Sequence, residues 1–202
     1  MVLDSAIDPA RPGAVKGTEN GPLREAALRE WAGWAARHDD RYHGSGQPTP
    51  ALDDALAGLL TGARSAMHSA QTAIMCADAA VPRKPERYRR DIEAHRAEAP
   101  LFGPLTRNIS PCAFWPAAPA GPPVRVHNAV PALVVSAEGD IDADLTQGRA
   151  MHRALTGSRM ITLAGVRTHG VYLFRGAGCV DDAVNAYLAT GTLPAHDLTC
   201  VE

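Results

Sequence analysis

The stretch Pro131-Ala132-Leu133-Val134-Val135-Ser136 is a short, almost continuous apolar run within a chain of 202 residues. A run of this kind is typical of a strand buried on both faces of a parallel sheet. Working outward from it, the pattern predicts a helix over about 146–155, a strand over 159–163, and a helix over about 180–189 that ends at Gly191. Strand, helix, strand, helix is a βαβ pattern, so we expect an α/β fold with a parallel sheet.

The chain before this run is predicted to be mainly helical. Residues 2–5 look like the end of a strand that passes into a polar loop. Apolar residues then recur at helical spacing, and Pro100 to Pro123 is an irregular connector rich in proline and turn residues. The helices are expected over about 22–38, 52–60, 65–76 and 86–97. We therefore expect a helical insertion between two parts of an α/β domain.

Composition indicates a soluble globular protein and argues against two classes of partner. Hydrophobic residues make up 46% of the chain and charged residues 21%, which is ordinary for a folded domain. The formal net charge of -2 leaves no basic footprint for nucleic acid or an anionic membrane. No apolar run approaches the roughly 18 residues that a bilayer span needs. The N-terminus also lacks the basic start and apolar stretch of a signal peptide, so the chain alone predicts a cytoplasmic protein.

Four scattered cysteines, without a C-x-x-C pair, give no zinc or thioredoxin signature. They allow two disulfides, which only an oxidising compartment would maintain. They equally allow four buried free thiols, and composition leaves both interpretations open.

Two polar loops follow the predicted strands. The loop after Ser136 contains Asp140 and Asp142, and the loop after Leu163 contains His169. Functional groups of open parallel sheets lie at the carboxyl ends of strands. An acid after one strand and a histidine after the next is the order Ser, Asp, His of α/β-hydrolases, with the serine further upstream. The alternative is that both loops are plain solvated turns.

Longer blocks of sequence carry a more specific signal. In the last third they are residues 131–140, 149–155, 157–159, 169–172 and 179–200. Further upstream they are residues 2–9, 73–78 and 111–116. These blocks are spread over a span that includes most of the chain, and they resemble the C-terminal region of the tripeptidyl-aminopeptidase-like (TAP-like) family of serine α/β-hydrolases.

The resemblance implies the C-terminal part of an α/β-hydrolase fold together with a helical cap insertion. Residues 1–10 would be the strand and loop that follow the nucleophile region. Residues 11–123 would form the helical cap, and residues 124–202 the C-terminal α/β-hydrolase segment. The resemblance further implies disulfides Cys76–Cys112 and Cys179–Cys200, and a family that is typically secreted, so the localisation of this chain stays unknown.

The resemblance also implies roles for individual residues. Asp140 matches the family's triad acid and His169 its triad base, which takes a proton from a serine hydroxyl and returns it to the leaving group. Asp142 is an alternative acid, because Ile141 and Ala143-Asp144 replace the prolines that the family usually carries here. Asp78 is a candidate for binding the free amine of a peptide substrate.

The sequence contains no G-x-S-x-G nucleophile elbow. Its nearest imitation is Ser45 in His43-Gly44-Ser45-Gly46, which lies between two predicted helices and follows no strand. We therefore expect the serine and the oxyanion hole upstream of Met1. Loss of a triad nucleophile costs up to about a million-fold in turnover, so the isolated chain is not expected to be a competent peptidase.

Three interpretations of the function follow. The chain is a truncated hydrolase, the C-terminal half of a split hydrolase, or a peptide-binding pseudoenzyme. The expected partners are a peptide or ester substrate and, at an exposed sheet edge, an N-terminal hydrolase half or a second copy of the chain. No cofactor and no metal are predicted. His38 to His43 could suggest a metal site, but a helix end is the simpler explanation. His152, Trp31 and Trp34 are expected to be structural, with the two tryptophans in the core.

Overall fold

The computed structural model describes residues 1–11, 19–37, 66–119, 121–122 and 124–201. The chain forms two compact units, one made of Met1–Arg11 and Pro123–Glu202 and the other of Pro12–Pro122. We call them the α/β unit and the helical unit. The predicted helix over 52–60, Ser45 and the segment from His38 to His43 lie outside the described residues. Among the residues described, no helix is long and apolar enough to span a membrane.

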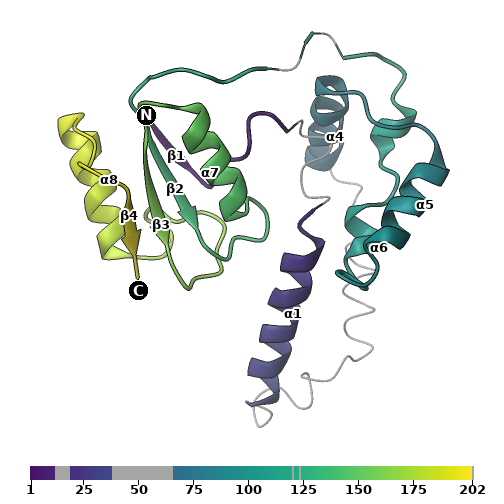
Figure 1. Cartoon of the computed structure of the whole chain (residues 1–202), viewed down its shortest axis with the longest axis horizontal. Coiled ribbons are helices and arrows are strands. Elements are labelled where there is room, and N and C mark those ends of the chain that lie inside the picture. The colour runs from purple at the N-terminus through teal and green to yellow at the C-terminus, as the bar shows by residue number, and fades with distance from the viewer. Residues whose placement is uncertain (12–18, 38–65, 120, 123, 202) are drawn as a thin grey trace. The chain divides into compact units, whose positions relative to one another are not determined.

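The α/β unit is built on a four-stranded, fully parallel sheet in the order β1-β2-β3-β4 (Figure 1). The strands are β1 (Val2–Asp4), β2 (Leu133–Ala137), β3 (Arg159–Leu163) and β4 (Leu198–Cys200). The register pairs Val2 with Leu133, Leu133 with Arg159, and Ile161 with Leu198. This sheet confirms the predicted α/β fold with parallel strands. The short β4 was not predicted.

Helices α7 (Leu145–Ala154) and α8 (Gly178–Thr190) lie on opposite sides of the sheet (Figure 1). The side chains of β2 alternate between them, and all five residues of the strand are fully buried. Leu133, Val135 and Ala137 join the core that includes Val180, Val184 and Tyr187 of α8. Burial of each large aliphatic side chain in this core contributes about 1.5–3 kcal/mol, which explains why the strand is an almost continuous apolar run.

On the opposite face α7 packs closely against β2, because the helix presents a glycine there. A Cβ atom on Gly148 would lie 2.2 Å from the hydroxyl of Ser136, closer than real atoms approach. The N-cap of α7 is Asp144, whose side chain accepts hydrogen bonds from the backbone N–H groups of Thr146 and Gln147. At the other face, the predicted end of α8 at Gly191 is confirmed, with φ at 70°.

The helical unit is held by a few long-range contacts. Its elements are α1 (Gly21–Ala36), α4 (Ala66–Asp78), α5 (Pro85–Ala94), α6 (Gly103–Thr106) and the 3-10 helix η3 (Pro111–Phe114). Buried Glu25 of α1 accepts hydrogen bonds from the backbone N–H groups of Leu101 and Phe102, just before α6. A disulfide joins Cys76 of α4 to Cys112 of η3. The segment predicted as an irregular connector thus contains two short helices.

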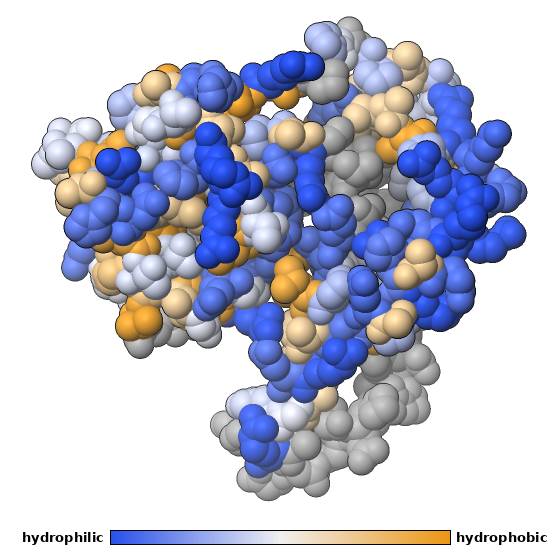
Figure 2. Space-filling model, in the orientation of Figure 1, coloured by the Kyte–Doolittle hydropathy of each residue, from blue (hydrophilic) through white to orange (hydrophobic). Residues whose placement is uncertain are grey.

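The surface of the helical unit corrects one prediction. Trp31 and Trp34 of α1 are 48% and 38% exposed, so the expectation that both belong to the core is wrong. Helix α5 buries none of its side chains completely, and the surface there is made mainly of hydrophilic residues (Figure 2). Partial burial of Tyr88, whose hydroxyl donates to the Pro82 carbonyl, raises the pKa of that phenol. The role of this unit as a substrate cap stays a prediction.

Candidate active site

The predicted acid lies in a tight turn directly after β2. Asp140 is buried, and its Oδ1 accepts hydrogen bonds from the backbone N–H groups of Asp142 at 2.8 Å and Ala143 at 3.0 Å. These two bonds fix the carboxylate plane against the loop and compensate for the loss of solvent around one oxygen. The second oxygen, Oδ2, is left to face the neighbouring loop.

The predicted base meets that second oxygen. His169 follows β3, and its Nδ1 lies 2.9 Å from Oδ2 of Asp140. The side chain of Asp140 is fully buried whereas that of His169 is 52% exposed. Because an ionised carboxylate can only accept hydrogen bonds, Nδ1 carries the proton and Nε2 of the neutral ring is the acceptor. Asp140, the first of the two candidate acids, is thus in direct contact with the predicted base.

The loops after β2 and β3 are joined to each other by two hydrogen bonds from backbone N–H groups. The N–H of Gly139 donates to the Val166 carbonyl at 2.9 Å, and the N–H of Gly165 donates to the carboxylate of Glu138 at 2.7 Å. A Cβ atom on Gly139 would lie 2.9 Å from the Val166 carbonyl oxygen and 2.7 Å from Cγ of Arg167. Only glycine allows the acid loop to approach the histidine loop this closely.

Two residues at the end of β1 also contact the histidine loop, and the sequence did not single them out for this. Oδ2 of Asp4 accepts hydrogen bonds from the N–H groups of Val171 at 2.8 Å and Tyr172 at 2.9 Å. The hydroxyl of Ser5 accepts one from the N–H of Gly170 at 2.9 Å. The sequence signal was a polar pair after a short apolar strand, which by itself does not identify a partner more than 160 residues away.

The remaining predicted site residues lie elsewhere. Asp78 is exposed and is the last residue of α4, in the helical unit. The disulfides join Cys76 to Cys112 and Cys179 to Cys200, the pairs that the resemblance implies. Within the described ranges, no group of three or more His, Cys, Asp or Glu side chains could hold a metal ion.

A second Ser, His and Asp combination lies at the opposite ends of the strands. Nδ1 of His152 is 2.7 Å from the hydroxyl of Ser158, and its Nε2 is 3.3 Å from Oδ2 of Asp197. Ser158 is buried, and its hydroxyl donates to the Leu155 carbonyl. A buried hydroxyl that donates to a backbone carbonyl is a poor nucleophile. We therefore assign this group a structural role, because its contacts connect α7, the start of β3 and the segment before β4.

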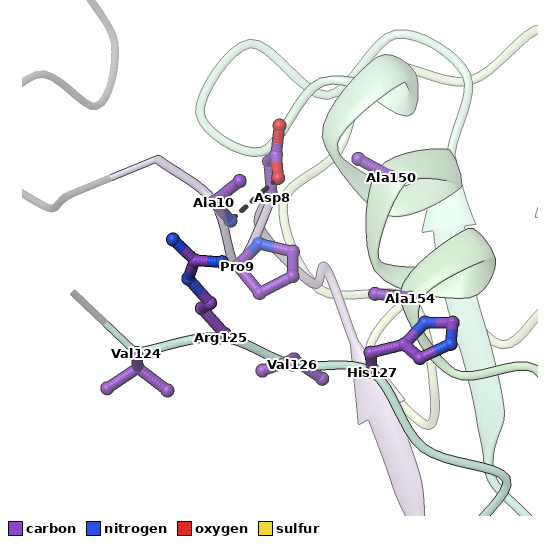
Figure 3. Close-up of a pocket in the computed structure, with 9 residues that line it drawn as sticks. All are labelled: Asp8, Pro9, Ala10, Val124, Arg125, Val126, His127, Ala150 and Ala154. Carbon is purple, nitrogen blue, oxygen red and sulfur yellow. Dashed lines mark hydrogen bonds between the residues drawn. The ribbon is translucent and has the colours of Figure 1, made fainter.

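A cavity of about 500 Å³ lies in the α/β unit beside α7 (Figure 3). Its walls come from residues 8–10 after β1, residues 124–127 before β2, and one side of α7. They are Asp8, Pro9, Ala10, Val124, Arg125, Val126, His127, Ala150 and Ala154. None of the predicted site residues lines it, so it is separate from the Asp140–His169 pair.

A parallel sheet with helices on both faces, and with an aspartate and a histidine in contact at neighbouring strand ends, defines a partial α/β-hydrolase fold. The chain belongs to the family described as TAP-like protein, whose sequence model matches residues 99–200. This membership confirms the resemblance given by the sequence blocks.

Individual relatives carry names from hydrolase chemistry. The chain is 32% identical over 133 residues to the tripeptidyl aminopeptidase of Streptomyces lividans, covering 64% of this chain and 24% of that protein. It is 35% identical over 94 residues to serine protease Hip1 of Mycobacterium tuberculosis, covering 46% and 18%. It is 33% identical over 139 residues to carboxylesterase B of the same organism, covering 63% and 25%. The chain thus spans about a quarter or less of the length of these relatives.

Proposed function

We propose that this chain supplies the acid and the base of a serine peptidase that releases short peptides from the N-termini of its substrates. The observation that carries the proposal is the 2.9 Å contact between Nδ1 of His169 and the buried carboxylate of Asp140. The names of the relatives, a tripeptidyl aminopeptidase and a serine protease among them, support the substrate class. The nucleophile is a serine outside these 202 residues.

In this mechanism Asp140 keeps the proton of the neutral imidazole on Nδ1, which leaves Nε2 of His169 free to accept. Nε2 takes the proton of the serine hydroxyl as that oxygen attacks the substrate carbonyl, and returns it to the leaving amine. The buried carboxylate stabilises the imidazolium that forms in between. The two backbone hydrogen bonds to Asp140 hold the acid in place throughout.

The edge of the sheet at β1 is where we place the serine-bearing segment. Among the described strands β1 pairs with β2 alone, and its carboxyl end contacts the histidine loop through Asp4 and Ser5. A further parallel strand beside β1 would end on the same side of the sheet as His169, where a strand-to-helix turn can present a serine. An unpaired edge also favours association with another chain.

The test is co-expression of this chain with the coding sequence immediately upstream of it. We expect a fluorophosphonate probe to label a serine in the upstream segment, and we expect hydrolysis of a tripeptide coumarin amide that has a free N-terminus. His169→Ala should abolish both signals, whereas Asp142→Asn should retain them. The proposal would be contradicted if the probe still labels the serine in His169→Ala. It would also be contradicted if the assembled protein with His169 in place is not labelled.

Asp78 supports a second candidate function, the binding of peptide amines by the helical unit without turnover. It is the last residue of α4, where the helix dipole disfavours a carboxylate and favours a cation. A free α-amine bound there would be attracted by the carboxylate and by the helix end together. We expect calorimetry to detect binding of a tripeptide with a free N-terminus but not of its acetylated form. Equal heats from Asp78→Asn and the unchanged chain would argue against this function.

A further inference from the structure

We propose that Asp4 and Ser5 are positioning residues that hold the loop of His169, so that its Nδ1 stays on Asp140. This inference rests on the proposed function, because it concerns the same acid–base pair. The acid and the base follow β2 and β3, and Asp4 and Ser5 lie at the end of the neighbouring strand β1.

The contacts run along consecutive backbone groups of the histidine loop. The N–H of Gly170 donates to the Ser5 hydroxyl at 2.9 Å, and the next two N–H groups, of Val171 and Tyr172, donate to Oδ2 of Asp4 at 2.8 and 2.9 Å. Two of these bonds end on a carboxylate, and hydrogen bonds to charged groups are stronger than neutral ones. The backbone that follows the base is therefore fixed from β1.

The contacts matter because the histidine itself is poorly covered. Its side chain is 52% exposed, so few packing contacts restrict the ring. Gly170, the next residue, has φ at 81° with open space around it, so neither crowding nor a side chain limits this turn. The hydrogen bonds to Asp4 and Ser5 supply the restraint that packing does not.

Ser5 is itself held in an unusual conformation. Its φ is 54°, a region that residues other than glycine adopt only under strain. The strained backbone is anchored by the N–H of Ser5, which donates to the Val135 carbonyl of β2 at 2.9 Å, and by its hydroxyl, which donates to Oδ1 of Asp4 at 3.2 Å. Backbone strain of this kind persists where the surrounding contacts hold it in place, and such residues cluster at functional sites. Glycine would relieve the strain but would lose the hydroxyl, so Ser5→Gly separates positioning from stability.

The experiment is proton NMR on the 202-residue chain, following solvent exchange of the His169 Nδ1–H. We expect Asp4→Ala, which removes both acceptor oxygens, and Ser5→Gly to speed this exchange at least tenfold, with Ser5→Gly leaving the melting temperature unchanged or raised. Asp8→Ala is the matched control, because Asp8 accepts from Ala10 and pairs with Arg11, not with the histidine loop. The control should exchange as the unchanged chain does.

The outcomes separate the two proposals. If the unchanged chain shows no protected Nδ1–H, or if Asp140→Asn leaves that proton unaltered, the acid–base pair and the positioning role both fail. If Asp140→Asn removes the signal while Ser5→Gly and Asp4→Ala exchange as slowly as the unchanged chain, only the positioning role fails. Ser5→Gly keeps the test decisive even if Asp4→Ala does not fold.

Discussion

Replacing Asp140 with asparagine should move the proton of the neutral His169 ring from Nδ1 to Nε2 while leaving the fold intact. The carboxylate accepts three hydrogen bonds, two from backbone N–H groups on Oδ1 and one from the histidine on Oδ2. In Asp140→Asn the amide oxygen takes the Oδ1 position, because only an acceptor satisfies two N–H groups. The amide NH₂ then faces Nδ1 of His169, which must become the acceptor, so the ring proton moves to Nε2.

The magnitudes follow from this exchange. The number of hydrogen bonds is kept, but three bonds to a charged group become neutral ones. Each such change costs about 1 kcal/mol, so the three together should lower the free energy of unfolding by about 3 kcal/mol. In the assembled protein a ring with its proton on Nε2 cannot act as the base, and a loss of about 10⁴ in turnover is the expected scale.

The assay is ¹⁵N NMR of His169 in the isolated chain under mildly alkaline conditions. We expect the Nδ1–H tautomer in the unchanged chain and the Nε2–H tautomer in Asp140→Asn. Asp142→Asn is the matched control, because its backbone N–H still donates to Asp140. If His169 keeps its proton on Nδ1 in Asp140→Asn, the reasoning is refuted, and a reversal in Asp142→Asn would make that residue the acid.

Three further predictions concern stability and are measured by thermal or urea unfolding. Gly139→Ala should cost about 1–3 kcal/mol through crowding against the facing loop, whereas Gly178→Ala, with open space around it, should be neutral or stabilising; equal losses would contradict the close-approach argument. Asp144→Ala should cost about 0.5–2 kcal/mol at neutral pH through loss of the α7 N-cap. Burial would raise the pKa of Asp144, but hydrogen bonds from the first turn of α7 hold it below its ordinary value. The stabilisation from Asp144 is therefore present above the ordinary aspartate pKa of about 3.9, and it is lost as the pH falls through the lower pKa of the folded protein. The difference in the free energy of unfolding between Asp144→Ala and the unchanged chain should consequently narrow in acid. A difference that does not change with pH would count against the cap. Replacing Cys179 and Cys200 with serine opens a loop with a sequence separation of 21, worth about 3 kcal/mol, and an unchanged melting temperature would show that this link adds nothing.

The strands that are buried on both faces could be predicted from the sequence, whereas the last strand could not. The apolar runs of β2 and β3 stand out because helices cover them on both sides. β4 has three residues, and its central Thr199 is exposed, so no periodicity marks it. It is a strand because it pairs with β3 and because a disulfide fixes its last residue to α8.

For the site, the pairing of Asp140 with His169 could be predicted because both follow strands whose carboxyl ends meet at one edge of a parallel sheet. The contacts of Asp4 and Ser5 could not, since they join residues about 165 positions apart through backbone N–H groups that any residue offers. Helical spacing likewise did not reveal that Trp31 is exposed. Periodicity shows which residues lie on the same side of a helix, but it does not show whether another element packs against that side.

The pairing of β1 with β2 has a consequence for how the protein is made. Val2 lies opposite Leu133, so the two partners are 131 positions apart in the sequence, and all of the helical unit is synthesised between them. At about 5–20 residues per second, ribosomal synthesis leaves β1 without β2 for roughly 6 to 26 s. During that time the first strand is available to chaperones or to edges on other chains. The helical unit, by contrast, is continuous in sequence and can begin to fold while the ribosome is still translating the rest.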